Sequence, residues 1–403
     1  MRGIKILIAI ACATPALAQV KPPPPKFAKS WKLAPFYTKH VAVEGFPIVA
    51  SRKVSDYALL EAAYLVRKMI GGRKDLLRAL VKNKVRFVVM GYGEFTTDIP
   101  EYRRLQPRLY WNRRARGLGP SEKIPAVSCG EENLLNYPGD PYDAENILIH
   151  EFAHAIHSAA LSVTDPTFDE RLETAHAAAV KAGLWKGKYA GRNHHEYWAE
   201  GVQSWFGTNR EDDHDHNHVN TRAELQKYDP GLAKLVAEVF GKNDWRYVRP
   251  ADRRPASAHL KGYDAKAAPK FAWAAKDNAW YQRYRKGLVT LAPADAVELE
   301  LLSPESDNWR SPRTPHQTEI FLANASGLTL RVEWIDFDGE AKAYGTVRPG
   351  GHFRQQTFTG HVWRMSDAQS GRALHYFITP KASGQLVFRG AKKEGKDLQD
   401  RRK

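Results

Sequence analysis

His150-Glu151-Phe152-Ala153-His154 is an H-E-x-x-H stretch within a run, Ala144 to Ala160, that contains neither Gly nor Pro. Residues four apart on a helix project from the same face, so His150 and His154 can bind one metal ion. Glu151 can then hold a water molecule on that metal and accept its proton, as peptide hydrolysis requires. The stretch therefore predicts a zinc-binding helix, and the alternative is a helix whose histidines are satisfied in the core.

The same run predicts an amphipathic helix over 144–160, with Asp143 as its N-cap residue. His150, His154 and His157 are spaced to share one face. A second face is apolar and consists of Leu148, Phe152, Ala155 and Ala159. Such a helix can pack one side against a core and offer its histidines to a cleft.

A second helix is expected over 193–206, with Asn193 as its N-cap residue. Glu196 and Glu200 are four residues apart and share a face of this helix. Glu196 would complete a ligand set of two imidazoles and one carboxylate, which leaves the fourth tetrahedral position to water. Glu200 would accept the free ring N–H of a ligand histidine. The alternative is that Glu196 only closes a capping box with Asn193.

Together with Tyr189, these residues resemble the catalytic domain of the anthrax lethal factor type of zinc peptidase, over about 125–210. The resemblance implies that His150, His154 and Glu196 are the zinc ligands. It also implies that Glu151 is the general base and that Tyr189 stabilises the oxyanion. A phenol that donates to a developing oxyanion is a reasonable stabiliser. The alternative is that Tyr189 is a half-buried loop residue.

The first 18 residues have the features of a secretory signal peptide. A basic start, Met1 to Lys5, is followed by the apolar stretch Ile6 to Ala13 and the cleavage site Ala16-Leu17-Ala18. We expect a mature chain from Gln19 that is secreted or periplasmic in a bacterium. A lipoprotein anchor on Cys12 is an alternative that the short apolar stretch disfavours. No later segment approaches the length of a membrane span, so no stable membrane insertion is expected after cleavage.

The composition limits the remaining possibilities. A chain of 403 residues with 43% hydrophobic residues and 11 Trp predicts two or three domains with real cores. Cleavage would leave Cys129 as the sole cysteine, so no intramolecular disulfide can form. The net charge of +16 favours anionic partners such as cell-wall polymers or acidic substrates. No nucleic-acid-binding motif organises this charge, so a nucleic-acid partner is not expected, and the oligomeric state is not indicated.

Residues 36–250 are expected to form an α+β, zincin-like metallopeptidase domain after a Pro-rich spacer over 19–35. Its predicted elements are helices over 57–70 and 75–81 and strands over 85–90 and 126–129. The strand at 126–129 is either an edge strand that pairs with an extended substrate or an ordinary interior strand. The Arg- and Gly-rich region 104–122 is expected to be an exposed loop.

Two further segments have no regular pattern. Asp212-Asp213-His214-Asp215-His216-Asn217-His218 contains many metal-ligand types and is expected to be a solvated loop, with a structural metal site as the alternative. Within it, His218 is the candidate for lining the cleft, since it is nearest the following helix. Residues 251–294 are expected to be a connector, with aromatic residues at Trp273, Trp280, Tyr281 and Tyr284.

The pattern changes from about residue 295 to short alternating strands, such as 318–322 and 328–334. Turn signals follow at Asp338-Gly339 and Pro349-Gly350-Gly351. This spacing predicts an all-β sandwich over 295–392, followed by a basic tail over 393–403.

This C-terminal region resembles the β-domain of the von Hippel–Lindau tumour suppressor. The resemblance is carried by Trp334 to Glu340, Pro349-Gly350 and Thr357 to Trp363. The family binds a hydroxyproline-containing peptide in an aromatic pocket. The resemblance implies a peptide-binding set of Trp334, Tyr344, Thr357, His361 and Trp363, where Thr357 replaces a serine of the family.

Two positions depart from the family pattern. Gln356 stands where the family has a histidine, and Phe358 where it has a tyrosine. These changes argue against hydroxyproline selectivity but leave an aromatic cage for a proline-like ring. The family's α-domain has no counterpart in the sequence, so its ubiquitin-ligase role is not carried over. The alternative is a stable sandwich in which Trp334 and Trp363 are core residues.

These features together predict a secreted zinc endopeptidase with Zn²⁺ as cofactor and a protein or peptide as substrate. The C-terminal sandwich would capture proline-rich or hydroxyproline-like segments. One alternative is a non-catalytic binding protein whose zinc site is structural or degenerate. Another is a metal hydrolase that acts on cell-wall peptide. Intact Glu151 and Tyr189 favour a peptidase, because a purely structural zinc site needs neither.

Overall fold

The computed structural model describes residues 19–241, 243–305 and 308–390, which form two compact units. The first unit runs to Arg103 and from Arg116 to Ala272, and the second combines Arg104–Ala115 with the chain from Trp273 onward. The expected connector over 251–294 is therefore divided between the units. The expected signal peptide and basic tail lie outside the described residues. No helix within the described ranges is both long and apolar enough to cross a membrane.

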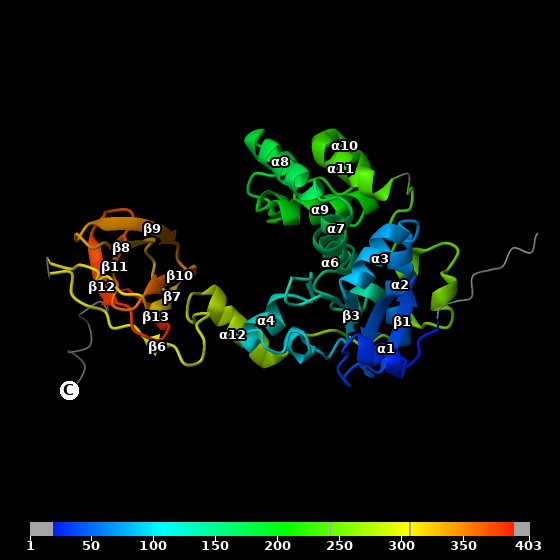
Figure 1. Ribbon diagram of the computed structural model, residues 1–403, viewed down its shortest axis with the longest axis horizontal. Helices are drawn as coiled ribbons and strands as arrows, with labels where there is room; N and C mark the ends of the chain where they lie inside the picture. The colour runs from blue at the N-terminus through cyan, green and yellow to red at the C-terminus, as the bar shows by residue number, and fades with distance from the viewer. Residues whose placement is uncertain (1–18, 242, 306–307, 391–403) are drawn as a thin grey trace, which may run out of the picture. The chain divides into compact units, whose positions relative to one another are not determined.

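A five-stranded sheet organises the first unit, in the order β1-β2-β3-β5-β4. Figure 1 labels its strands β1 and β3. Its strands are β1 (Lys39–Val43), β2 (Phe46–Ala50), β3 (Arg86–Met90), β4 (Gly117–Leu118) and β5 (Ala126–Gly130). Strands β2, β3 and β5 are parallel, and β4 pairs antiparallel with β5 at the edge. The edge-strand prediction for 126–129 is therefore wrong and the interior alternative is confirmed, since the short β4 occupies the edge.

Helices precede and follow these strands. Three of them are α1 (Pro25–Ser30), α2 (Asp56–Ile70) and α3 (Lys74–Lys82). The predictions for 57–70 and 75–81 are confirmed by α2 and α3. The expected spacer over 19–35 instead contains α1, and Lys21 pairs with His40 of β1. Pro25 begins α1 because proline lacks only an N–H that the first helical turn leaves unbonded anyway.

The helix that carries the H-E-x-x-H stretch is α6 (Ile147–Ala155). Its N-cap is Asn146, whose side chain accepts from the Ile149 N–H, so the predicted cap Asp143 and start at 144 are wrong. Beyond Ala155 the backbone changes to one π-helical segment, Ile156–Leu161. The predicted continuous helix over 144–160 is thus interrupted immediately before His157.

The remaining helices of the first unit follow α6 along the chain or lie just before it. They are α5 (Glu131–Leu135), α7 (Ser162–Thr164), α8 (Phe168–Lys181), α9 (His194–Phe206), α10 (Arg222–Tyr228) and α11 (Pro230–Phe240). Figure 1 shows α8, α9, α10 and α11 grouped beyond α6. Helix α9 confirms the prediction for 193–206, and Gly207 ends it with a positive φ of 72°.

Helices α6 and α9 are fixed against each other by buried contacts. The indole N–H of Trp198 in α9 donates to the carbonyl oxygen of Ala153 in α6 at 2.9 Å. The Trp198 ring also stacks on Phe240, with ring centroids 6.0 Å apart. On its sheet side, α6 buries Phe152 against Phe46. These contacts set the distance between the histidines of α6 and the glutamates of α9.

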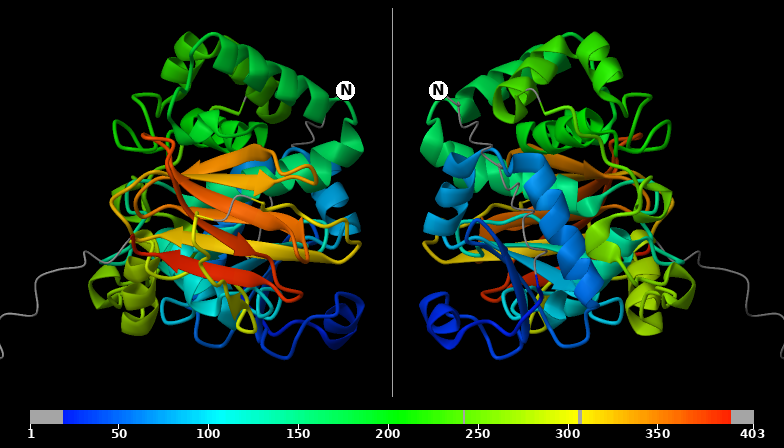
Figure 2. Two further views of the ribbon diagram at one scale, coloured as in Figure 1. Left: turned by 90° about the vertical axis from the view of Figure 1, so that its left-hand side faces the viewer. Right: turned by 90° about the vertical axis from the view of Figure 1, so that its right-hand side faces the viewer.

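The second unit contains two four-stranded sheets, β10-β7-β13-β6 and β12-β11-β8-β9 (Figure 2). Their strands are β6 (Val297–Glu298), β7 (Gln317–Asn324), β8 (Leu330–Ile335), β9 (Ala341–Val347), β10 (His352–Phe358), β11 (Val362–Asp367), β12 (Ala373–Ile378) and β13 (Gly384–Phe388). Both sheets bury side chains in one core around Trp363, Met365 and Phe377. The predicted β-domain is therefore present.

Two helices also belong to the second unit, α4 (Arg108–Arg114) and α12 (Ala275–Arg285). Tyr110 of α4 packs among Trp280, Tyr281 and Tyr284 of α12. The prediction of an exposed loop over 104–122 is wrong, because this aromatic contact orders 108–114 as a helix and 117–118 forms β4. The aromatic residues expected in a connector are thus the partners of α4.

Candidate functional site

Three predicted zinc ligands lie together in the first unit. His150 Nε2 is 3.2 Å from His154 Nε2, and the Oε2 atom of Glu196 lies 3.3 Å and 3.4 Å from these two nitrogens. The three atoms therefore form a nearly equilateral triangle. Zinc–ligand bonds of about 2.0–2.2 Å in a tetrahedron give ligand–ligand distances of about 3.3–3.6 Å. The triangle has the dimensions of one face of such a tetrahedron, so these residues fit a zinc ion.

The carboxylate of Glu196 gives a second indication of the same fit. Its Oε2 atom is shielded from solvent and accepts no hydrogen bond within the described residues, although it faces both histidines. A buried carboxylate oxygen without a hydrogen-bond donor is costly unless a cation or proton neutralises it. The capping alternative explains only the contact of the Glu196 backbone, whose N–H donates to the Asn193 side chain at 2.9 Å. The Glu196 side chain is directed to the histidines instead.

The electrostatics of the site favour positive charge. Burial lowers the pKa of His150, but the carboxylates of Glu196, Glu151 and Glu200 outweigh this effect and raise that pKa to about 10. For Glu196, burial raises the pKa, and the two histidines outweigh burial and hold the pKa well below its ordinary value. A group of imidazoles that carboxylates surround in this way can exchange its protons for a divalent cation.

A side chain that the sequence analysis missed orients the first histidine. The Oε1 atom of Gln203 lies 2.7 Å from His150 Nδ1, whereas the predicted partner, Glu200, is 3.6 Å from that nitrogen. Gln203 in turn donates from Nε2 to Glu145 at 3.0 Å. The direct partner of His150 is thus an amide rather than the predicted carboxylate. This contact leaves His150 Nε2 to face the centre of the triangle.

The chain of polar contacts from His150 through Gln203 to Glu145 continues into the segment 212–218. Glu145 pairs with Arg210 at 3.0 Å, and Arg210 pairs with Asp213 at 3.1 Å. Asp213 contacts His216 Nδ1 at 2.8 Å, and His216 Nε2 lies 3.3 Å from Glu200. His216 is only 4% exposed, so the expectation of a solvated loop is wrong for this residue. His216, rather than the predicted candidate His218, links this segment to the site.

His157 does not join the triangle although its spacing placed it on the same face. It lies in the π-helical segment that begins at Ile156, and its Nε2 lies 2.8 Å from Asp169 of α8. Its side chain is 3% exposed. His157 is seven residues beyond His150, about two helical turns along the axis, so shared spacing alone does not bring it to the triangle.

Glu151 lies under the edge strand of the sheet. A methyl group on Gly117 of β4 would lie 2.9 Å from Glu151 Cγ, and one on Gly119 would lie 3.4 Å from Glu151 Oε2. The backbone of residues 117–119 therefore lies against α6 next to Glu151, the predicted general base. Among the described residues β4 is the last strand of its sheet, and such an edge next to Glu151 is the arrangement that an extended peptide needs for strand addition.

Tyr189 lies at the start of a 3₁₀ turn, Tyr189–Gly191, immediately before α9. Its ring centroid is 6.3 Å from that of His150, and the Arg192 guanidinium lies 4.4 Å from the same ring. Its backbone N–H donates to Asp215 at 2.8 Å. The structure thus brings the tyrosine to the edge of the triangle, beside the ring of His150.

The five residues of the predicted peptide-binding set gather in the second unit, but with unequal exposure. Trp334 stacks on His361 at 5.2 Å, and Tyr344 packs edge-on against Trp363 at 4.9 Å. The Trp363 indole donates to Thr357 Oγ1 at 3.1 Å, and both residues are buried. Tyr344 is 47% exposed. The core alternative therefore describes Trp363; His361 is buried as well, whereas Trp334 and Tyr344 are nearer the surface.

Residues 309–377 match the family model of the VHL beta domain. The match spans β7 to nearly the end of β12 and contains all five residues of the predicted peptide-binding set. The predicted resemblance of the C-terminal region is confirmed. The resemblance of the first unit to a zinc peptidase stays a prediction.

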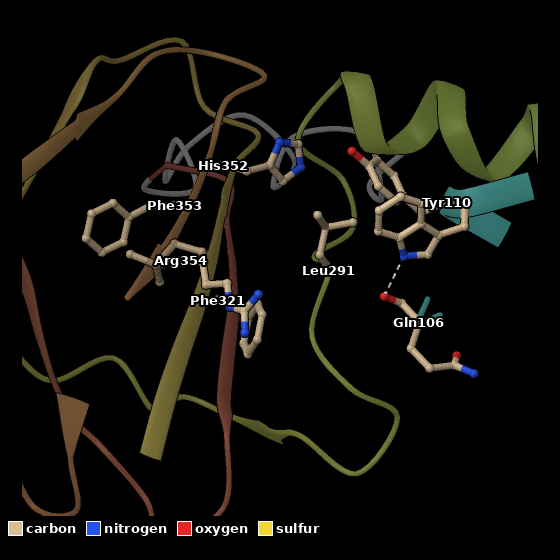
Figure 3. Close-up of a pocket in the computed structure, with 9 residues that line it drawn as sticks. Gln106, Tyr110, Leu291, Phe321, His352, Phe353 and Arg354 are labelled. Atoms are coloured by element: carbon tan, nitrogen blue, oxygen red, sulfur yellow. Dashed lines mark hydrogen bonds between the residues drawn. The ribbon is translucent and has the colours of Figure 1, made fainter. Parts of the chain in front are cut away.

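A separate hollow lies on the other sheet of the second unit. It has a volume of about 230 Å³ and is lined by Gln106, Tyr110, Trp111, Leu291, Phe321, Leu322, His352, Phe353 and Arg354 (Figure 3). Trp111 donates its indole N–H to the Gln106 carbonyl at 3.1 Å. His352 stacks on Tyr284 at 3.9 Å, and burial lowers its pKa. Sequence reasoning missed this hollow because 106–111 was expected to be an exposed loop.

Proposed function

We propose that the first unit is a zinc-dependent endopeptidase. The observation that carries the proposal is the triangle of His150 Nε2, His154 Nε2 and Glu196 Oε2, with Glu151 in the same helical turn. A zinc ion at such a site acts as a Lewis acid and lowers the pKa of a bound water. Two imidazoles, one carboxylate and an open fourth position are typical of catalytic zinc sites. The presence of a general base separates this arrangement from a purely structural site.

Each side chain has a defined task in the proposed reaction. Glu151 accepts a proton from the attacking water and returns it to the leaving amine. Tyr189 donates its phenolic hydrogen to the oxyanion as charge develops there. The edge strand β4 aligns an extended substrate beside Glu151 by backbone hydrogen bonds. Gln203 holds the ring of His150 so that Nε2 faces the metal position.

The proposal is tested by metal analysis and by digestion of a broad set of proteins, with wild type compared with Glu151→Ala. We expect one zinc in the triangle of both proteins and cleavage by the wild type only. Zinc binding without any cleavage of protein would refute the endopeptidase. Cleavage of cell-wall peptide alone would support the alternative hydrolase. Failure to bind zinc at His150 and Glu196 even after reconstitution would refute the ligand assignment.

We further propose that the second unit binds an extended, proline-containing segment. The match to the VHL beta domain and the cluster of Trp334, His361 and Tyr344 favour this function. Aromatic faces suit the flat ring of proline. The family has a histidine at position 356 and a tyrosine at position 358. Gln356 supplies no imidazole and is hydrogen-bonded to Gln317 at 3.0 Å, and Phe358 supplies no hydroxyl group. We therefore expect proline and hydroxyproline peptides to bind about equally.

Titration of the full chain with matched proline and hydroxyproline peptides tests this second proposal. Isothermal titration calorimetry measures the binding, and Tyr344→Ala should weaken it by about tenfold. No response to either peptide would leave the sandwich as a scaffold. Peptide binding by a protein that cleaves nothing would support the non-catalytic binding protein. We also propose that the protein is exported, as its N-terminal sequence predicts. Detection of the mature chain outside the cytoplasm tests this proposal.

A further inference from the structure

Helices α8 and α9 carry another cluster of metal-ligating side chains that the proposed reaction does not use. Asp169 and Glu173 are four residues apart on α8, and His194 is the first residue of α9. These three residues can each offer one ligand atom, and the three atoms lie within 4.8 Å of one another. The carboxylates are 54% and 58% exposed, so an ion can reach them from solvent.

The geometry of His194 indicates a missing partner. Its Nε2 atom is shielded from solvent and makes no hydrogen bond with any described residue. That atom nevertheless lies 3.4 Å from Asp169 Oδ1, and Nδ1 of the same ring lies 3.7 Å from Glu173 Oε1. A distance of 3.4 Å is long for a hydrogen bond but equals the separation of two ligands on one tetrahedral zinc ion, about 3.3–3.6 Å.

Asp169 is also held in place from the buried side. Nε2 of His157 lies 2.8 Å from Asp169 Oδ1, and its other ring nitrogen faces His195 Nδ1 at 3.4 Å. A hydrogen bond from a buried imidazole orients the carboxylate as an outer partner orients a metal ligand. His157 itself lies in the π-helical segment 156–161, and such segments are frequent at functional sites.

We propose that Asp169, Glu173 and His194 form a second divalent-cation site that joins α8 to the start of α9. One imidazole with two carboxylates suits Zn²⁺, whereas Ca²⁺ prefers oxygen ligands alone. All three ligands are distinct from His150, His154 and Glu196, so this site can exist whether or not the first unit is a peptidase. Its ion would hold α9 at the point where the helix begins, two residues before Glu196.

Zinc counting in the full chain tests the site, with Glu196→Ala used to remove a ligand of the first triangle. After chelation and equilibration with zinc alone, we expect two ions per wild-type chain and one per Glu196→Ala chain. We also expect zinc to raise the melting temperature of the Glu196→Ala chain. Adding Glu173→Gln to that chain should abolish both the binding of the remaining ion and this rise. Adding Glu170→Gln, which removes an equal charge from the neighbouring exposed position of α8, should leave both unchanged.

Asp169→Asn gives an independent check, and circular dichroism establishes that each variant is folded. Retention of the ion by both Glu173→Gln and Asp169→Asn, or its absence from Glu196→Ala, would overturn the proposal. One ion in the wild type that persists in Glu196→Ala and disappears in Glu173→Gln would support this site while refuting the first triangle. The two assignments can therefore fail separately.

Discussion

His150 Nδ1 lies 2.7 Å from Oε1 of Gln203, so the helix that supplies Glu196 also orients the first histidine of α6. The same amide reaches Glu145 at 3.0 Å through its nitrogen. Helix α9 thus supplies both the proposed carboxylate ligand and the support for one imidazole. A displacement of α9 would move both groups together, which couples the geometry of the triangle to the packing of Trp198 between α6 and α11.

Gln203→Leu tests this coupling. The substitution replaces the amide by an apolar side chain of similar size, which removes the partner of His150 Nδ1 and one contact of Glu145. We expect zinc affinity to fall about 10–100-fold, as is typical when an outer partner of a ligand is lost. Competition with a chromogenic chelator measures the affinity. Gln226→Leu on the exposed face of α10 is the control and should leave it unchanged; equal affinities in both variants would contradict the assigned role.

Tyr189→Phe tests the proposed oxyanion donor. The variant keeps the ring beside His150 and removes only the hydroxyl group. We expect kcat to fall about 10²–10³-fold with little change in KM, because the lost hydrogen bond forms only as charge develops. Zinc content should stay at the wild-type value. Tyr92→Phe, at a 41% exposed position of the same unit, is the matched control. An unchanged kcat in Tyr189→Phe would assign the oxyanion to another group.

His150, His154 and Glu196 were predictable as candidate ligands because motif spacing within two helices indicates them. His150 and His154 are fixed by helical spacing, and Glu196 is placed by the helix that Asn193 caps. Gln203 and His216 were not predictable, because an amide and one histidine among several become site residues only through contacts between distant segments. His157 shares the helical spacing of His150 and His154 but lies seven residues beyond His150, so spacing alone does not bring it to the triangle.

The fold shows the same division. Strands β3 and β5 and helices α2 and α3 follow from periodicity alone. Strand β4 has two residues, Gly117 and Leu118, and no alternation could reveal it. Helix α4 was assigned to a loop because its arginines suggested solvent, whereas Tyr110 places it against α12. Tertiary contacts therefore determined the elements that the local pattern missed.

Gly117→Ala tests the close approach of the edge strand to α6. A methyl group at this position would lie 2.4 Å from Ile147 Cγ2 and 2.9 Å from Glu151 Cγ. We expect the free energy of unfolding to fall by about 1–3 kcal/mol, as is typical of overpacking. Activity should fall as well, because the displaced backbone moves the substrate edge away from Glu151. Urea denaturation and peptide cleavage measure the two effects.

Gly93→Ala is the control for that experiment, since a methyl group there would meet no atom within 4 Å. It should change the free energy of unfolding by less than about 0.5 kcal/mol and leave cleavage unaffected. If Gly117→Ala behaved like Gly93→Ala, the edge strand would not lie against α6 as described, and the proposed alignment of substrate along β4 would lose its basis.

Thr357→Val tests whether the polar contact inside the sandwich is structural. The buried indole N–H of Trp363 donates to Thr357 Oγ1 at 3.1 Å, and valine fills the same volume without an acceptor. An unsatisfied buried donor costs about 1–3 kcal/mol. The free energy of unfolding of the second unit should fall by that amount, and its urea midpoint should therefore move to a lower concentration. Thr346→Val, at an exposed position of β9, should cause almost no shift. The opposite outcome would be a loss of proline-peptide binding in Thr357→Val with no loss of stability. That outcome would place this hydroxyl in contact with the peptide, because a ligand contact affects only the bound state, whereas a core contact affects the folded protein itself.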